Sequence, residues 1–340
     1  MRVAVYYSNQ DIRIEEVEVP KIGAGELLIR TEACGICGTD VLEWYRKKRA
    51  PVVLGHEATG VVVEVGEGVT AYKPGDRVFV SHHVPCEVCR YCLMGKETAC
   101  ETLHTTNYYP GGFSQYIRVP KINVEKGTYL LPDFVSFEEG VFIEPLGCVI
   151  RGQRVAGLKK DDTLLILGSG VAGLLHLQLA RLKGVSKIIA TDISEKKLEY
   201  AKRLGADLTI NARKEDVKQA LIHFNGRGAD KVVLCTGAPS AYEDALRCVD
   251  RGGTVLFFAV PDPSYRPYIP LTEYWRNEVT LTTSYGAAPR DLEEALKIIS
   301  SKSLELSGLI THRLPLSETP LGFRLVVEGE SLKVVINPNR

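Results

Sequence analysis

The stretch TLLILGSGVAGLLHLQLA, residues 163–180, decides the fold of this chain. Its first five residues, Thr163–Leu167, are almost entirely apolar and predict a buried strand, and the apolar run after Gly173 predicts a helix. Between them, Gly168, Gly170 and Gly173 form the pattern G-x-G-x-x-G. The first glycine permits a tight turn, the second lets a pyrophosphate approach the backbone, and the third lets the helix pack on the strand. Because the helix N-terminus also attracts phosphates, the stretch predicts a dinucleotide site.

An acidic residue follows at the spacing that such a site requires. The next expected strand, Lys187–Thr191, leads into Asp192, which is 22 residues beyond Gly170. A carboxylate there accepts hydrogen bonds from both ribose hydroxyls of adenosine and repels a 2′-phosphate. We therefore expect NAD as the coenzyme, whereas Lys196 and Lys197 would favour NADP. The alternative, that the glycines only form a turn and Asp192 only caps a helix, does not account for the strand, the spacing and the acid together.

The region around this stretch alternates short apolar strands with amphipathic helices. This rhythm is typical of a parallel sheet with helices on both faces. We expect six strands, at Thr163–Leu167, Lys187–Thr191, Asp207–Ile210, Lys231–Leu234, Thr254–Phe258 and Val279–Thr283.

The rest of the chain is β-rich. Before the dinucleotide region, short alternating segments such as Leu27–Thr31 and Thr59–Val65 are separated by glycine and proline, which predicts a compact β domain. After it, a helical stretch, Leu292–Ser300, precedes β segments that end at Val334–Ile336. We expect this C-terminal part to rejoin the first domain. Two domains also agree with the length of 340 residues, which exceeds what one hydrophobic core usually serves.

Charge and hydropathy argue against two classes of partner. Forty-two basic residues balance forty-two acidic ones without a long run of one sign, so we do not expect nucleic acid. Residues 163–180 are apolar enough to suggest a membrane span, but the glycines, Ser169, His176 and Gln178 interrupt them. The first residues, MRVAVYYSNQDIRI, lack the apolar core and cleavage site of a secretory signal. We therefore expect a cytoplasmic protein without a membrane partner.

Four of the nine cysteines have the spacing of a metal site. They form a C-x2-C-x2-C-x7-C array, at Cys86, Cys89, Cys92 and Cys100. Four thiolates fill the tetrahedral coordination of zinc and leave no position for a substrate, so the array predicts a structural zinc. The alternative of unpaired surface thiols does not explain the repeated x2 spacing.

A second metal site is suggested by dispersed residues. Cys37 lies in the segment CGICGTD, residues 34–40, and His56 and Glu57 follow in the sequence Gly-His-Glu. A thiolate, an imidazole and a carboxylate suit zinc, and a site with three protein ligands keeps one position open. From spacing alone, the alternative that these are packed core residues stays open.

The order of these motifs resembles that of the zinc-containing medium-chain dehydrogenases, and the resemblance spans essentially the whole chain. It is nearest to the sorbitol (polyol) and threonine dehydrogenase branch, because Glu144-Pro145-Leu146 stands where other alcohol dehydrogenases carry a cysteine ligand. The resemblance implies an α/β protein. A β-rich, GroES-like catalytic domain would comprise residues 1–148 and 287–340, and a Rossmann dinucleotide-binding domain with a doubly wound parallel sheet would comprise residues 149–286.

The resemblance also implies residue roles in the catalytic domain. Cys37 and His56 would bind the catalytic zinc. Glu57 resembles a carboxylate that ligates directly or in exchange with water, and Glu144 resembles the acid that completes the set, directly or through water. Asp40 would accept a hydrogen bond from the ring N–H of His56 and fix its tautomer.

For the coenzyme and the assembly, the resemblance implies further features. The backbone of Val171 would touch the pyrophosphate, and Lys197 matches a basic position beside the adenosine ribose. Two zinc ions per chain would be bound, one catalytic and one structural. The protein would be a homotetramer or homodimer, joined through the edge strand near Val279–Thr283.

The chain departs from the pattern of its branch in the segment after Asp40. Leu42 replaces a histidine that helps to pass a proton to solvent, and Glu43 replaces a tyrosine that often faces the substrate. Glu43 is either a general base with a raised pKa beside Trp44 or a solvated surface residue. His83 matches a histidine of threonine dehydrogenases, and a role in the loop alone is an equal alternative.

These features together predict an enzyme. Zinc with an open position polarises an alcohol oxygen, Thr39 is placed to accept the alcohol proton, and a hydride passes to the nicotinamide. A glutamate in place of the second thiolate makes the metal site harder and favours a polar substrate. We expect an NAD-dependent dehydrogenase that interconverts a small-molecule alcohol and ketone of the polyol, cyclitol or sugar-acid type. The alternatives are an L-threonine 3-dehydrogenase, a secondary alcohol dehydrogenase and, from another class, a catalytically silent protein that binds zinc and nucleotide.

Overall fold

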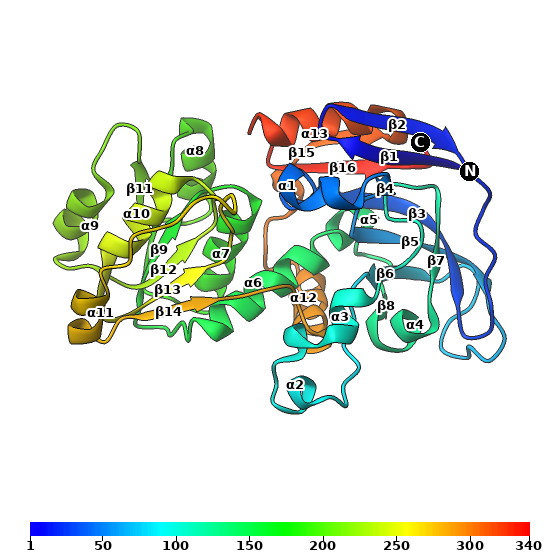
Figure 1. Cartoon of the computed structure of the whole chain (residues 1–340), viewed down its shortest axis with the longest axis horizontal. Coiled ribbons are helices and arrows are strands. Elements are labelled where there is room, and N and C mark those ends of the chain that lie inside the picture. Colours follow the sequence, from blue (N-terminus) through cyan, green and yellow to red (C-terminus); the bar gives the residue numbers. More distant parts are fainter. The chain divides into compact units, whose positions relative to one another are not determined.

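The computed structural model describes all residues of the chain, Met1–Arg340. The chain forms two compact units, each of which can be followed in Figure 1. The first unit contains Met1–Gly147, Ala287–Lys302 and Leu306–Arg340, and the second contains Cys148–Gly286 and Ser303–Glu305. Helix α6 (Ile143–Val155) contributes residues to both units.

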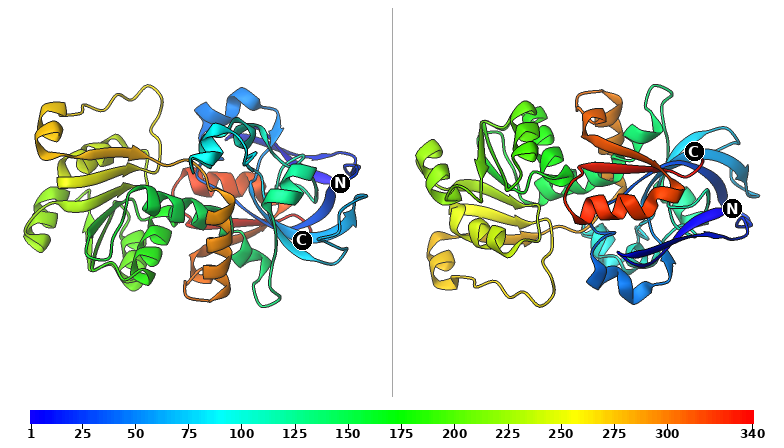
Figure 2. Two further views of the ribbon diagram at one scale, coloured as in Figure 1. Left: turned by 90° about the horizontal axis from the view of Figure 1, so that it is seen from below. Right: turned by 90° about the horizontal axis from the view of Figure 1, so that it is seen from above.

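The second unit is built on a six-stranded parallel sheet in the order β11-β10-β9-β12-β13-β14. Figure 2 shows helices on both faces of this sheet. The strand order reverses between β9 and β12, and the carboxyl ends of the strands at such a point bind ligands. The strands are β9 (Thr163–Leu167), β10 (Lys187–Asp192), β11 (Leu208–Asn211), β12 (Ala229–Leu234), β13 (Val249–Phe257) and β14 (Thr280–Thr283). The helices are α7 (Val171–Leu182), α8 (Glu195–Arg203), α9 (Val217–Asn225), α10 (Pro239–Cys248) and α11 (Leu271–Asn277).

This architecture confirms the expected doubly wound fold. Two strands begin earlier than expected, β12 at Ala229 and β13 at Val249, because these two residues already pair in parallel register. The first residues of these two strands do not form an apolar run. Hydropathy alone therefore places the starts of the strands too late.

The core of the second unit explains why its strands are apolar throughout. Leu165, Ile189 and Val232 lie on three neighbouring strands and pack into one fully buried cluster. Helices cover both faces of the sheet, so neither face of a strand needs polar side chains. Residues 163–180 thus divide into β9, the glycine turn and most of α7. None of the helices combines the length and the apolar composition needed to cross a bilayer.

The first unit is mostly antiparallel. One sheet has three strands in the order β2-β1-β4, and a seven-stranded sheet has the order β15-β16-β3-β5-β6-β8, with β7 also paired to β3. Only β15 and β16 pair in parallel. The strands are β1 (Arg2–Ser8), β2 (Asp11–Glu16), β3 (Leu27–Gly35), β4 (Val52–Val53), β5 (Glu57–Val65), β6 (Arg77–Ser81), β7 (Tyr116–Val119), β8 (Thr128–Leu130), β15 (Ile310–Pro315) and β16 (Lys333–Asn337). The helices are α1 (Glu43–Arg46), α2 (Arg90–Leu93), α3 (Glu101–Thr105), α4 (Lys121–Gly127), α5 (Phe137–Gly140), α12 (Pro289–Ser300) and α13 (Thr319–Val327).

Three adjacent strands of the large sheet meet at one edge. Gly35, the last residue of β3, lies opposite Glu57, the first residue of β5, and also opposite Val335 of β16. The end of β3, the start of β5 and the start of β16 therefore converge, although they are separated by up to about three hundred residues of sequence. The candidate site is assembled at this edge.

Candidate active site

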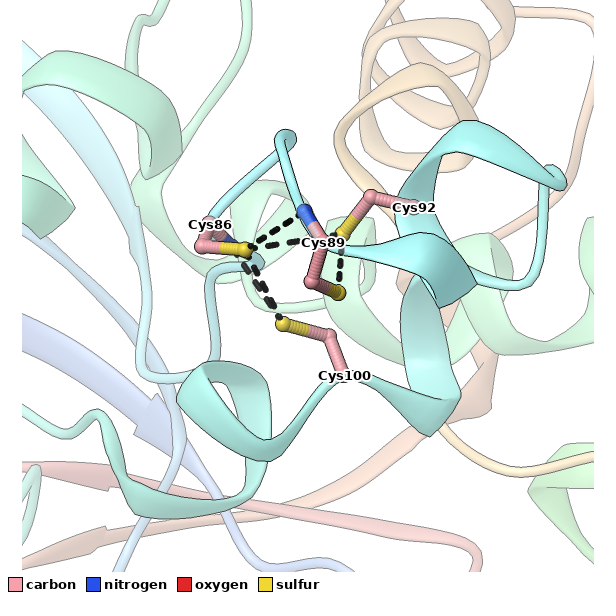
Figure 3. A group of neighbouring side chains, drawn as sticks. All are labelled: Cys86, Cys89, Cys92 and Cys100. Atoms are coloured by element: carbon pink, nitrogen blue, oxygen red, sulfur yellow. Dashed lines mark hydrogen bonds between the residues drawn. The ribbon is translucent and has the colours of Figure 1, made fainter.

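The four cysteines of the C-x2-C-x2-C-x7-C array point toward one another (Figure 3). The sulfur of Cys89 lies 3.5 Å from that of Cys92, and the sulfur of Cys86 lies 3.6 Å from that of Cys100 and 4.0 Å from that of Cys92. A tetrahedral zinc with bonds of about 2.3 Å separates its sulfur ligands by about 3.8 Å. The four sulfurs thus have the spacing of a tetrathiolate zinc site.

Backbone N–H groups favour the thiolate forms of Cys86 and Cys100, whereas burial and the hydrogen bond with Cys89 raise the pKa of Cys92 to about 12. The N–H of Cys86 donates to the sulfur of Cys100 at 3.4 Å, and the N–H of Cys89 donates to the sulfur of Cys86 at 3.3 Å. N–H groups of Val88 and Cys89 lower the pKa of Cys86. Burial raises the pKa of Cys100, but N–H groups of Cys86 and Leu103 outweigh it and lower this pKa to about 6. Thiolate is the form that binds a metal, so the local backbone prepares these two sulfurs for one.

The second set of donors lies at the converging strand ends. The ligand atoms of Cys37, His56 and Glu57 all lie within 4.8 Å of one another. The turn before His56 requires Gly55, whose φ is +90° and where a Cβ would lie 2.9 Å from the backbone nitrogen of Phe113. The Gly-His-Glu sequence thus turns the chain sharply and delivers two donors at the start of β5.

Asp40 orients the imidazole of His56. Its Oδ1 lies 3.2 Å from Nδ1 of His56, and its Oδ2 accepts a hydrogen bond from the N–H of Cys37 at 3.0 Å. Burial raises the pKa of the fully buried Asp40 carboxyl, but the charges of His56 and Arg46 outweigh it and keep the pKa below its usual value. Nδ1 of His56 is therefore engaged, and Nε2 is left for a metal.

Thr39 is held between the thiol and a cation. Its hydroxyl donates to the sulfur of Cys37 at 3.3 Å, and Nη2 of Arg46 donates to the same hydroxyl oxygen at 3.2 Å. Arg46 also reaches the carbonyl of Thr39 through Nε at 3.0 Å and Oδ1 of Asp40 through Nη2 at 3.4 Å. Sequence reasoning missed Arg46, because a basic residue in the run RKKR carries no signal that separates it from its solvated neighbours.

Glu57 is paired with a buried lysine. The Nζ of Lys333 donates to both oxygens of Glu57, at 2.8 and 2.6 Å, and to the carbonyl of Ile36 at 3.3 Å. Glu57 is fully buried, and Lys333 is 2% exposed. Burial lowers the pKa of Lys333, but the charges of Glu57, Cys37 and Glu144 outweigh it and raise this pKa. Sequence reasoning missed Lys333 as well; the available signal was a lysine that opens the otherwise apolar strand KVVIN.

The remaining predicted residues lie at different distances from these donors. Glu144 lies in the first turn of α6, is 8% exposed and contributes to the field at Lys333, but its carboxylate is not part of the three-residue cluster.

Glu43 begins α1 and, with burial, raises the pKa of Tyr6. Leu42 precedes that helix and is half-buried. The structure thus places Arg46 of α1, rather than Glu43, against Thr39.

His83 lies one ring away from the donors. Its ring centroid is 3.8 Å from that of His82, whose ring centroid is 4.9 Å from that of His56. Sequence reasoning singled out His83, but His82 is the histidine that packs on His56. The pair His-His was visible in the sequence, and only the fold shows which member faces the metal donors.

The glycine turn of the second unit has the geometry that a pyrophosphate requires. Gly168 has a φ of +97°, and a Cβ on Gly173 would lie 1.9 Å from the carbonyl oxygen of Gly168, so neither position accepts another residue without a shift. Gly170 precedes α7, and no atom lies within 4 Å of the place where its Cβ would be. Open space at the N-terminus of a helix, beside Val171, fits a phosphate group.

Asp192 stands next to this turn at the end of β10. Its Oδ2 accepts the N–H of Ser169 at 2.8 Å, and its Oδ1 accepts the N–H of Ser194 at 2.9 Å. The carboxylate therefore ties the glycine turn to the following loop, and each oxygen keeps a lone pair for a further donor. Lys197 lies in the first turns of α8 and is half-buried.

Comparison with known proteins places the chain in a family. An alcohol dehydrogenase GroES-like domain matches residues 23–132, and a zinc-binding dehydrogenase domain matches residues 172–301. Sorbitol dehydrogenase from Mus musculus is 32% identical over 346 aligned residues, covering 98% of this chain and 96% of that protein. L-threonine 3-dehydrogenase from Bacillus licheniformis is 33% identical and covers 95% and 94%. A zinc-binding dehydrogenase from Sinorhizobium meliloti, solved with NADP, superimposes with a TM-score of 0.88 at 29% identity and covers 99% of both chains.

The chain therefore belongs to the zinc-dependent medium-chain dehydrogenases, whose members include alcohol and polyol dehydrogenases. This confirms the resemblance inferred from the motifs and the expectation of an enzyme that acts on alcohols.

The two groups of donors predict two kinds of loss on substitution. Cys89→Ser breaks a closed thiolate cluster and is expected to lower the melting temperature by roughly 5 °C or more, because such sites contribute folding energy. Cys37→Ser is expected to abolish turnover with a much smaller thermal shift. Calorimetric melting and initial rates measure both effects. Equal thermal shifts in the two variants would contradict the division into a structural and a catalytic site.

The buried Lys333–Glu57 pair predicts an uneven effect of single and double substitution. Lys333→Met leaves a carboxylate buried without its cation and is expected to cost about 3–5 kcal/mol in the free energy of unfolding of the zinc-free protein. Lys333→Met combined with Glu57→Gln is expected to recover most of this loss. Lys302→Met, which breaks the exposed pair with Glu139, is the matched control and should cost at most about 1 kcal/mol. Urea unfolding measures all three; an equal loss in the single and double variants would show that the stranded charge is not the cause.

Proposed function

We propose that this chain is an NAD-dependent dehydrogenase that oxidises the carbinol carbon of a polyol, cyclitol or sugar acid. The observation that carries the proposal is the open set of donors, Cys37, His56 and Glu57, with the hydroxyl of Thr39 bonded to the first of them. An incomplete metal shell beside a proton acceptor is the arrangement that alcohol oxidation needs.

In this proposal Cys37 and His56 hold the catalytic zinc. When bound, zinc supplies a Lewis acid that favours loss of the alcohol proton, and NAD accepts the hydride. The chain supplies the rest. Asp40 fixes the tautomer of His56 through the 3.2 Å contact, and Oγ1 of Thr39 would accept a hydrogen bond from the alcohol hydroxyl. The same four-cysteine cluster described above holds the second, structural zinc.

Glu57 and Glu144 share the remaining metal contacts in this proposal. Lys333 holds both oxygens of Glu57, so this carboxylate is divided between the ammonium group and the metal. Glu57 would ligate in exchange with water, and Glu144 would complete the set, directly or through a water. A mobile carboxylate keeps one coordination position available for an alcohol.

The coenzyme is proposed to be NAD. Gly168, Gly170, Val171 and Gly173 would receive the pyrophosphate at the start of α7, and Asp192 would bind the adenosine ribose, with Lys197 at its side. The Sinorhizobium meliloti relative is bound to NADP, so the family alone does not decide between the coenzymes. The carboxylate of Asp192 supports NAD, because a 2′-phosphate next to it would be repelled.

A homodimer or homotetramer joined through β14 is proposed for the assembly. This strand ends the parallel sheet, and its residues, TLTT, include neither a charge nor a proline. Edge strands without such residues are normally paired or covered.

L-threonine 3-dehydrogenase activity is the second candidate. The Bacillus licheniformis enzyme of that name is 33% identical, and the ring of His83 packs on His82, which in turn packs on His56.

The proposed test is a screen of polyols, inositols, aldonates, L-threonine and 2,3-butanediol for NADH formation by zinc-loaded protein. Turnover of a polyol, inositol or aldonate is expected, and Thr39→Val should lower it at least about 100-fold. Preference for L-threonine would favour the second candidate, and no turnover at all would favour a silent zinc and nucleotide binder.

The role of Asp192 predicts a change of coenzyme preference. Asp192→Gly removes the repulsion of the 2′-phosphate and is expected to lower the NAD-to-NADP ratio of kcat/KM on the order of 10- to 100-fold. Glu199→Gln, which removes a carboxylate from α8, the helix that follows Asp192, is the control and should leave the ratio unchanged. A wild-type protein that uses both coenzymes equally would contradict the assignment.

A further inference from the structure

An unusual concentration of positive charge follows the Cys37 loop. The segment that runs through α1 and the short 3-10 helix Lys47–Arg49 carries four consecutive cations, Arg46, Lys47, Lys48 and Arg49. Only Arg46 has an ion-pair partner, Asp40, and that contact is long, at 3.4 Å. Lys47, Lys48 and Arg49 form no salt bridge and are exposed. The donor loop is therefore bordered by a segment of net positive charge.

Arg46 is the one cation of this segment that is fixed against the reacting groups. Its side chain is only 13% exposed, and its guanidinium lies 4.8 Å from the ring centroid of Tyr45, with Arg49 at 5.6 Å from the same ring. Nε and Nη2 are engaged by Thr39 and Asp40. A planar group with three hydrogen bonds and an aromatic neighbour has little freedom to turn away.

One nitrogen of this fixed group remains available. Nη1 of Arg46 makes no hydrogen bond, and it is not among the fully buried polar atoms that lack a partner, so it is open to solvent. Its two N–H groups belong to the same plane as the Nη2 that binds Thr39 Oγ1. An oxygen bound by Nη1 would thus be held by the same planar group that holds Thr39 Oγ1.

We propose that Arg46 determines substrate specificity by binding an anionic group, a carboxylate or a phosphate, carried by the hydroxylated substrate near its reacting carbinol. The inference rests on the proposed function and narrows its substrate class. A neutral polyol forms no charge-assisted hydrogen bond with the free N–H groups of Nη1, whereas an anionic oxygen does. If Arg46 only positioned Thr39 and Asp40, it would use Nε and Nη2. Nη1 and the neighbouring cations would then have no role.

Three substrates that share a six-carbon chain test this proposal: D-sorbitol, D-gluconate and D-sorbitol 6-phosphate. With zinc-loaded protein and saturating NAD, kcat/KM is expected to be at least about tenfold higher for an anionic substrate than for sorbitol. Arg46→Gln should lower this ratio about 10- to 100-fold, and Arg46→Lys should restore part of it. Lys48→Gln removes a charge from the same segment without a contact and should change the ratio less than about threefold. The anionic substrate with the higher kcat/KM, D-gluconate or D-sorbitol 6-phosphate, then shows whether Arg46 binds a carboxylate or a phosphate.

Calorimetric binding of D-gluconate and of inorganic phosphate to the same proteins gives a readout that does not need turnover. Wild type is expected to bind at least one of them, and Arg46→Gln to bind it at least about tenfold more weakly.

An equal loss of turnover with neutral and anionic substrates would show that Arg46 only positions Thr39 and Asp40. A raised KM for NAD with an unchanged substrate ratio would assign the guanidinium to the coenzyme. Either result, or absence of anion binding by wild type, overturns the proposal. If no alcohol is oxidised, the proposed function fails and calorimetry alone judges the anion site.

Discussion

The pairing of β3 with β5 and of β3 with β16 is the constraint on which the site depends. The register that sets Gly35 opposite Glu57 brings the end of one strand to the start of the next, so that the Cys37 loop and the Gly-His-Glu turn meet. The same register delivers Lys333 beneath Glu57, where its ammonium group binds both carboxylate oxygens. Since a shift of one residue would turn every side chain of the shifted strand to the opposite face, the donors converge only in this register.

The two groups of metal donors differ in how the chain holds them. The cysteine cluster is made by fifteen consecutive residues, from Cys86 to Cys100, and satisfies its own thiolates with local N–H groups. The Cys37 group depends on strands distant in sequence and on partners that compensate it, Asp40 for His56 and Lys333 for Glu57. A closed cluster of four local thiolates suits a structural metal. A group of donors that is oriented by neighbouring residues can leave one coordination position of the metal open for a substrate.

Sequence reasoning predicted the fold, the local motifs and the contact of Asp40 with His56, but it missed three other partners of the site. The glycine turn, the strands around it and the cysteine spacing are readable because each is a short-range pattern with its own physical cause. Arg46, His82 and Lys333 act through neighbours that only the folded chain supplies, and a lysine or arginine in sequence is usually solvated. Glu43 was singled out because it is the nearest ionisable residue in the sequence. In the folded chain Arg46, one helical turn further on, is the residue that contacts Thr39.

Zinc-edge anomalous diffraction from crystals of the zinc-loaded protein tests the central claim most directly, because it locates each metal without reference to activity. The account predicts two peaks per chain, one enclosed by the sulfurs of Cys86, Cys89, Cys92 and Cys100 and one bound by Cys37 and His56. A single peak at the four cysteines, or a second peak away from Cys37 and His56, would contradict it.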